Sequence, residues 1–270
     1  MRSVTRSGER DWKVNIPESW MQGRTIYGGL SASLCLQAVN NEYDELPPLR
    51  SAQFNFVGPA ANEVIIRTKV LRQGKSVRFI NAEISGEQGI STQATFCFGT
   101  SRNSKIDDNF IAPVTVPSPD HSVDLQMSAK GPAFTKNFDC FHSTGSLPIS
   151  KSNDPDFHLW VRHKDQSLQD NVAILSIADM APPAILTMFD EIAPVSSMTW
   201  MLNFLEEQPL TTDGWWLLNA TAEHSRNGYS SQNMNIRNRD GNLVITGRQN
   251  IALFYSVSYT HLTLPTIYSV

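Results

Sequence analysis

The sequence predicts an α+β fold made of two copies of one unit, each with a central helix wrapped by an antiparallel sheet. The evidence is a set of segments that return in the same order about 150 residues later. An Asn-Phe pair at Asn55 ends a strand-like stretch and recurs at Asn203, and residues 72–76 (RQGKS) have a counterpart in residues 226–230 (RNGYS). We therefore expect two units joined edge to edge in one sheet, with a groove between the copies.

The first copy is predicted to contain one helix followed by a strand meander. In residues 29–40, Leu30, Leu34 and Leu36 recur among small Ser and Ala residues, which is typical of a helix that packs closely on both sides. Alternation of apolar and polar residues predicts strands at residues 11–16, 50–57, 63–73, 76–85 and 91–98.

The second copy repeats this order. Its apolar residues predict a helix over residues 172–189, although Pro182 and Pro183 lie inside it and predict a break after Ala181. Predicted strands cover residues 158–162, 196–205, 215–225, 229–238 and 242–254. The predicted domains are an N-terminal unit of residues 1–103, a linker without periodicity at residues 104–136, and a C-terminal unit of residues 137–256.

Residues 257–270 are interpreted as a non-native tail. They follow a strand that is complete at Phe254, have no counterpart in the first copy, and resemble translated sequencing-adapter read-through. On this interpretation the natural C-terminus is missing or replaced, and His261 has no role. Deleting the tail is expected to leave the melting temperature and the turnover unchanged.

The composition is that of an ordinary soluble protein. The 270 residues carry a formal charge of −4, a pI near 5.9 and 40% apolar residues, so there is no basic field for nucleic acid. No apolar stretch approaches the ~20 residues that span a bilayer, so we expect no membrane association and a cytoplasmic location. Cys35, Cys97 and Cys140 have no CxxC spacing and are expected to be buried, reduced thiols, and no motif calls for a metal or cofactor.

Three segments resemble a known family. They are residues 23–32 (GRTIYGGLSA), 49–59 (LRSAQFNFVGP) and 241–249 (GNLVITGRQ), and their order and spacing are similar to those of thioesterase-like proteins of the acyl-CoA thioesterase II type. The resemblance implies a double hotdog fold, in which each central helix is wrapped by an antiparallel sheet and the acyl-thioester groove lies where the two units meet. It also implies an acyl-CoA substrate.

Gly28 and Gly29 are the predicted substrate-binding residues. They open the first helix, where unpaired backbone N–H groups meet the positive end of the helix dipole, and they have no side chain to block a ligand. Such a site can hold a thioester carbonyl and stabilise the oxyanion that develops on it. The alternative is that the two glycines only permit tight entry into the helix.

Asp179 is the predicted acid–base residue. Single-hotdog thioesterases of the phenylacetate-pathway type carry a His-Gly-Gly at the helix start and a Leu-Ala-Asp seven residues after the last Gly, and this chain resembles that pattern in two pieces. The first copy keeps the glycines and has Leu36 at the Asp position, whereas the second copy keeps Ile177, Ala178 and Asp179. The division predicts one composite site, with oxyanion donors from one half and the carboxylate from the other. A solvated or helix-capping Asp is the alternative.

Gln249 and Thr199 complete the predicted catalytic set. By spacing, Gln249 matches the glutamine that, in acyl-CoA thioesterase II, helps hold the attacking water with an Asp and a Ser or Thr; a structural hydrogen bond within the sheet is the alternative. The resemblance implies an Asp in the strand after the second helix, but this chain has residues 196–200 (SSMTW) there. Thr199 or Ser197 could therefore orient water but not act as its base.

His224 is a further candidate for a general base, because an imidazole has a suitable pKa. Its neighbours Glu223 and Ser225 cannot form a triad with it, since adjacent residues in a strand point to opposite faces. Glu223 is the next carboxylate to consider if Asp179 does not serve.

These features together predict hydrolysis of an acyl-CoA thioester to free acid and CoA, with general-base activation of water and no covalent enzyme intermediate. The absence of a GxSxG motif argues against an α/β-hydrolase thioesterase. One alternative is a non-catalytic acyl-CoA-binding protein, and another is a hotdog hydratase or dehydratase, which needs an Asp and a His aimed jointly at the substrate. Two fused units would complete the site within one chain, although exposed sheet edges could support a homo-oligomer.

Overall fold

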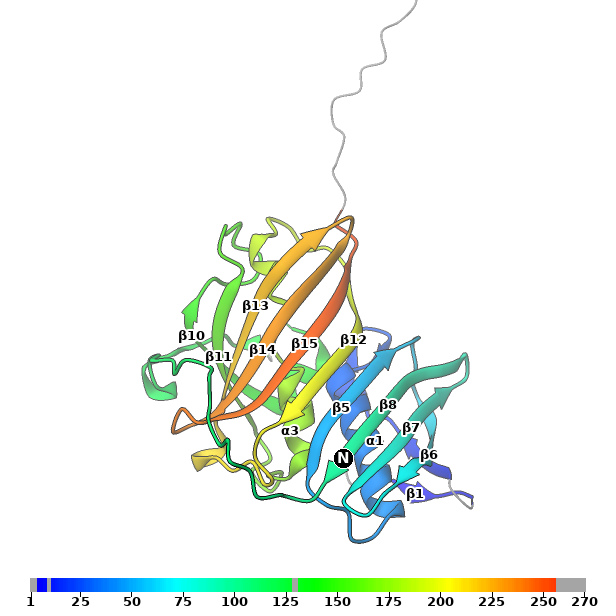
Figure 1. The fold of residues 1–270 in the computed structure, drawn as a ribbon. Coiled ribbons are helices and arrows are strands. Elements are labelled where there is room, and N and C mark those ends of the chain that lie inside the picture. Colours follow the sequence, from blue (N-terminus) through cyan, green and yellow to red (C-terminus); the bar gives the residue numbers. More distant parts are fainter. Residues whose placement is uncertain (1–3, 9–10, 128–130, 256–270) are drawn as a thin grey trace, which may run out of the picture.

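The computed structural model describes residues 4–8, 11–127 and 131–255, and their main feature is one large sheet around helices α1 (Gly28–Glu42) and α3 (Asn171–Ala178) (Figure 1). The N-terminal half contributes β1 (Thr5–Arg6), β2 (Asp11–Asn15), β5 (Leu49–Phe56), β6 (Glu63–Gln73), β7 (Val77–Gly86) and β8 (Gly89–Gly99). The C-terminal half contributes β9 (Val123–Asp124), β10 (Phe138–Gly145), β11 (Asp156–His163), β12 (Val195–Phe204), β13 (Trp216–Arg226), β14 (Tyr229–Asn238) and β15 (Leu243–Leu253). Two short strands, β3 (Met21–Gln22) and β4 (Thr25–Ile26), pair separately.

Within the described residues, the large sheet has 13 strands in the order β1-β2-β6-β7-β8-β5-β12-β15-β14-β13-β11-β10-β9, and neighbouring strands run antiparallel. Strands β5 and β12 meet at the centre, where Asn55 pairs with Thr199 and Ser51 pairs with Asn203. On one side of this seam the order is β8-β7-β6-β2, and on the other it is β15-β14-β13-β11. The two halves therefore share one topology and join edge to edge, as the sequence repeat predicts.

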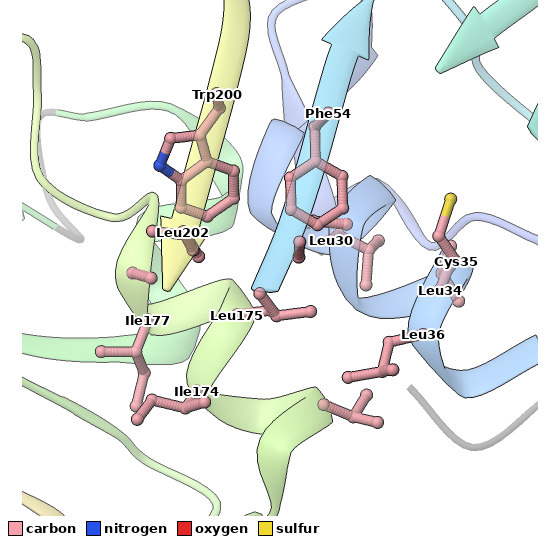
Figure 2. Close-up of a cluster of buried hydrophobic side chains, with 14 of the residues drawn as sticks. Leu30, Leu34, Cys35, Leu36, Phe54, Ile174, Leu175, Ile177, Trp200 and Leu202 are labelled. Atoms are coloured by element: carbon pink, nitrogen blue, oxygen red, sulfur yellow. The ribbon is translucent and has the colours of Figure 1, made fainter. Parts of the chain in front are cut away.

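Helices α1 and α3 pack against each other on one face of the sheet (Figure 1). Small residues bring the two backbones close, and the Ser33 hydroxyl donates a 2.7 Å hydrogen bond to the carbonyl of Val172. Figure 2 shows the core that the halves share, in which the rings of Phe54 and Trp200 lie 5.2 Å apart across the central seam. The labelled side chains are at most 2% exposed: Leu30, Leu34, Cys35, Leu36, Phe54, Ile174, Leu175, Ile177, Trp200 and Leu202.

Every strand predicted from alternation is present, with ends that differ by two residues at most. Strand β10 (Phe138–Gly145) was not predicted, because only Phe138 and Cys140 in it are buried and the alternation fades after them. Its pairing with β11 is also interrupted by an irregularity between His142 and Thr144. The position of such a strand is determined by pairing with its neighbour rather than by its own sequence pattern.

The prediction of a helix over residues 172–189 was wrong about its end. Helix α3 begins after Asp170, whose side chain accepts a 2.8 Å hydrogen bond from the N–H of Ala173, and it ends at Ala178. The residue before a proline avoids helical dihedrals, so Pro182 stops the helix from continuing through Ala181. A short 3₁₀ helix, Ala184–Met188, follows the two prolines.

Only part of the predicted linker, residues 104–136, packs over the face of the C-terminal sheet opposite the helices, whereas Phe134 near its end belongs to the main core and stacks on Tyr27. Val114 and Val116 cover a small apolar cluster around Trp160, and the indole N–H of Trp160 donates a 2.8 Å hydrogen bond to the carbonyl of Pro117. The linker also contains a 3₁₀ turn, Pro119–His121, and strand β9.

Three other sequence expectations concern cysteines, membranes and the tail. Cys35 and Cys140 are buried, Cys97 is partly buried, and all three thiols are free. None of the described helices combines the length and the hydropathy needed to cross a membrane. The predicted tail, residues 257–270, lies outside the described residues.

Candidate active site

Asp179 from the C-terminal half meets the N-terminus of α1 from the N-terminal half. It is the residue at which α3 ends, and the backbone N–H of Gly29 donates a hydrogen bond to its carboxylate. Helix α1 begins after Tyr27 without any side-chain cap of its own. The Asp179 carboxylate therefore takes the place of a capping group, where the helix dipole favours negative charge.

The glycine pair is explained by two different close contacts. A Cβ atom at Gly28 would lie 2.7 Å from Oδ2 of Asp179 and 3.3 Å from the ring of Phe56. A Cβ atom at Gly29 would lie 2.7 Å from the ring of Tyr27. Real Cβ atoms do not approach other heavy atoms so closely, so Gly28 leaves room for the carboxylate and Gly29 leaves room for the Tyr27 ring.

Gln249 links the carboxylate to the sheet. It lies on β15 and is only 5% exposed, and its Nε2 donates to Oδ1 of Asp179 at 3.3 Å and to the hydroxyl of Ser197 at 2.8 Å. An amide nitrogen has two hydrogens, so both bonds can form together. Two of the predicted catalytic residues, Asp179 and Gln249, thus lie in contact at the two glycines.

Ser197, and not Thr199, occupies the third position of this cluster. The pairing of β12 with β15 is interrupted between Ser197 and Thr199, and such a bulge changes the face to which the next side chain points. Ser197 is partly buried against Gln249, whereas Thr199 is exposed. Both residues were candidates from the sequence. The bulge determines which of them faces Gln249, and no clear sequence pattern predicts that bulge.

Burial raises the pKa of Asp179 from 3.8 to about 7. Loss of solvation disfavours the charged carboxylate, and the hydrogen bonds from Gln249 and Gly29 only partly offset this effect. A carboxylate with a pKa near neutrality can take a proton from water and return it within one reaction cycle.

Tyr27 lies beside the carboxylate but is held in a structural role. Its ring stacks on Phe134 with centroids 3.9 Å apart, and its hydroxyl donates a 2.6 Å hydrogen bond to the carbonyl of Ser176. Burial and the nearby Asp179 charge both raise the pKa of Tyr27, so the hydroxyl stays protonated.

The remaining candidates from the sequence lie in a different environment. His224 and Glu223, on β13, are both exposed, whereas Asp179 is partly buried. Glu223 pairs with Arg248 and accepts a hydrogen bond from Asn233. Over the part of the chain that the structure describes, no group of three or more His, Cys, Asp and Glu side chains is arranged to hold a metal ion.

Gln232 is a buried polar residue that was not predicted as part of the site. It lies on β14 directly opposite Gln249, is 0% exposed, and donates a 2.8 Å hydrogen bond to Oε1 of Gln249. Its inward position on an alternating strand was the available signal, since a buried amide needs partners.

The comparisons with known proteins agree with this architecture. A family model for the acyl-CoA thioesterase N-terminal domain matches residues 16–99, and one for the C-terminal domain matches residues 112–253. None of the curated proteins compared with the chain matches it. The matched domains support thioester hydrolysis as the general class of reaction.

Solved structures show the same fold at low sequence identity. A hot dog fold protein of unknown function from Alicyclobacillus acidocaldarius has a TM-score of 0.84 at 18% identity, covering 94% of this chain and 97% of its own. A candidate thioesterase II from Thermobifida fusca has a TM-score of 0.80 at 19% identity, covering 94% and 96%. An acyl-CoA thioesterase II from Mycobacterium marinum has a TM-score of 0.73 at 15% identity, also covering 94% and 96%. The chain has an α+β hotdog fold and belongs to the acyl-CoA thioesterase family.

Proposed function

We propose that this protein hydrolyses acyl-CoA thioesters to a free acid and CoA, with Asp179 as the general base that activates water. The observation that carries the proposal is the contact of the partly buried Asp179 carboxylate with Gln249 and with the N-terminus of α1. A carboxylate is costly to bury, and groups with such strongly perturbed pKa values concentrate at functional sites.

In the proposed reaction, a water molecule lies between the carboxylate of Asp179 and the polar groups of Gln249 and Ser197. Asp179 accepts a proton as the water oxygen bonds to the thioester carbon, which gives a tetrahedral intermediate. Collapse of the intermediate breaks the carbon–sulfur bond, and the departing sulfur receives the proton from Asp179. The products are a carboxylic acid and the CoA thiol, and Asp179 is again a carboxylate.

The N-terminus of α1 supplies the electrostatic part of the proposed mechanism. The N–H groups of the first helical turn have no partner inside the helix, and the dipole adds partial positive charge at Gly28 and Gly29. One of these N–H groups binds Asp179, and the others would receive the thioester carbonyl. Donors fixed in this way stabilise the oxyanion of the transition state more than the neutral carbonyl.

We further propose that the chain is a double hotdog whose complete site forms within one polypeptide. The glycines come from residues 1–103, and Asp179, Ser197 and Gln249 come from residues 137–256. Activity should therefore not depend on a second subunit, although the free edges of the sheet leave room for oligomers.

Release of free thiol from a panel of acyl-CoAs of varied chain length tests the proposal. We expect turnover on at least one acyl-CoA and its loss in Asp179→Asn. Tight acyl-CoA binding without thiol release by correctly folded protein would instead identify a non-catalytic binding protein. The hydrogen bond from Gln249 to the partly buried Asp179 favours hydrolysis over that alternative, since a carboxylate without a catalytic role would be free to face solvent.

A further inference from the structure

The amide of Gln249 can lie in two orientations, and only one of them points its nitrogen at Asp179. The two orientations fill the same space, so packing alone does not choose between them. In the structure, Nε2 faces Asp179 and Ser197, and Oε1 faces Gln232 on the neighbouring strand. The orientation of the Gln249 amide must therefore be determined by a hydrogen-bonding group that can only donate or only accept.

The choice can be traced to one backbone N–H. The N–H of Ala184 donates a 2.8 Å hydrogen bond to Oε1 of Gln232. A backbone N–H can only donate, so Gln232 must turn its oxygen toward Ala184 and its nitrogen toward β15. That nitrogen donates to Oε1 of Gln249 at 2.8 Å, so the nitrogen of Gln249 must in turn face Asp179 and Ser197.

Ala184 is available as a donor because of the two prolines before it. It is the first residue of the 3₁₀ helix Ala184–Met188, and the first N–H groups of a helix have no partner inside that helix. Pro182 and Pro183 have no N–H of their own and prevent α3 from continuing. The break in the second helix thus supplies the group that orients the amides.

We propose that Gln232 is a positioning residue, held by the N–H of Ala184, that fixes the Gln249 amide with its nitrogen toward Asp179 and Ser197. The proposal rests on the proposed function for its catalytic consequence, but the geometry stands by itself. Gln232 is 0% exposed, and both of its polar atoms are used by Ala184 and Gln249. It therefore acts through Gln249 and does not contact substrate.

The reversed orientation of Gln249 would harm the site in two ways. A carbonyl oxygen would face the carboxylate of Asp179, which removes a hydrogen bond that favours the charged base. The hydroxyl of Ser197 would lose its donor as well. Both changes would leave the attacking water less well held and the base harder to ionise.

The substitution Gln232→Met tests the proposal, because methionine is similar in length but can neither accept from Ala184 nor donate to Gln249. We expect the pKa of Asp179 to rise by roughly 0.5 or more, since about one hydrogen bond to the carboxylate is weakened. The pKa is measured by carbon NMR of labelled aspartate carboxyls, with the Asp179 signal assigned from Asp179→Asn. We also expect kcat to fall about tenfold with KM within about twofold, because the misplacement affects the reacting water rather than substrate binding.

Ser230→Ala is the matched control. Ser230 lies on the same strand and is 1% exposed, and its hydroxyl has no hydrogen-bond partner in the structure. Removing this hydroxyl should change neither the pKa of Asp179 nor kcat. A similar change in both variants would mean that any polar-to-apolar substitution on β14 disturbs the site, and would overturn the proposal.

A double-mutant cycle separates positioning from general structural damage. If Gln232 acts only through Gln249, then Gln232→Met should leave the pKa of Asp179 unchanged in a Gln249→Met background. A further rise in that background would overturn the proposal. This pKa cycle does not require activity, so a protein without thioesterase turnover would refute the proposed function and still test the role of Gln232.

The orientation can also be measured in the unaltered protein, which covers the case in which a variant fails to fold. We expect nuclear Overhauser contacts from the Gln249 side-chain amide protons to the β-protons of Ser197. Contacts from these protons to the Gln232 side-chain amide instead would show the reversed orientation and refute the proposal.

Discussion

Replacing Asp179 by Asn should inactivate the protein and stabilise it at the same time. The folded state holds the Asp179 proton more tightly than the unfolded chain, because the pKa rises from 3.8 to about 7 on burial. The contribution of Asp179 to folding is therefore most favourable at low pH and is lost as the pH rises from about 4 to about 7. Above that window the buried charge costs roughly 4 kcal/mol at most, from about 1.4 kcal/mol for each pKa unit.

Asn has almost the same shape as Asp but cannot ionise, so Asp179→Asn removes this cost. The gain in unfolding free energy of the variant over the unaltered protein should grow by roughly 3 kcal/mol between pH 5 and pH 8. Denaturant titrations at the two pH values measure this gain. In the same samples, kcat for an acyl-CoA should fall by ~10² to 10⁴, the usual contribution of a general base.

Asp107→Asn is the control, because Asp107 is an exposed residue of the linker and its substitution removes the same formal charge. It should leave both the stability and kcat nearly unchanged at either pH. If Asp179→Asn showed the same small pH dependence as the control, the carboxylate would not be a buried base with a raised pKa. Near-normal kcat in Asp179→Asn would move the catalytic role to another residue.

Three further predictions concern the groups around Asp179. Ser197→Ala should lower kcat by about tenfold, whereas Thr199→Ala should leave it near normal, because only Ser197 contacts Gln249; equal effects in steady-state assays would contradict this assignment. Gln249→Ala should lower kcat less than Asp179→Asn and should raise the pKa of Asp179, which is visible as a shift of the acid limb of the pH–rate profile. Gly28→Ala should lower kcat at least tenfold, since its Cβ would lie 2.7 Å from Oδ2 of Asp179, and unchanged kinetics would show that the carboxylate has another position.

The strands could be predicted from the sequence because their two faces meet different surroundings. In β6, for example, Val64, Ile66 and Thr68 are buried and the residues between them are not. Strand β10 lacks this contrast, and its place depends on pairing with β11. Local pattern predicts a strand well where several successive residues of one face are buried.

Some residues of the candidate site could likewise be predicted from the sequence, and others could not. Gly28 and Gly29 could be found because they open an apolar helical segment. Asp179 could be found because it resembles a known thioesterase pattern, although the end of its helix was predicted wrongly. The selection of Ser197 over Thr199 could not be predicted, since it depends on a bulge between paired strands. Gln232 could not be linked to Gln249 either, because the register of β14 and β15 brings together residues from two different strands.

The two helix N-termini differ in a way that supports one composite site, as proposed, and not two. Helix α3 begins after Asp170, whose own side chain accepts a hydrogen bond from the N–H of Ala173 and so occupies that end. Helix α1 has no such local cap, and its first turn is left for Asp179 and, in the proposed function, for a substrate carbonyl. The position in α1 that corresponds to Asp179 is Leu36, which is 1% exposed and serves the core. In the proposed function, each copy therefore supplies a part of the site that the other lacks: the glycines come from the first copy and Asp179 from the second.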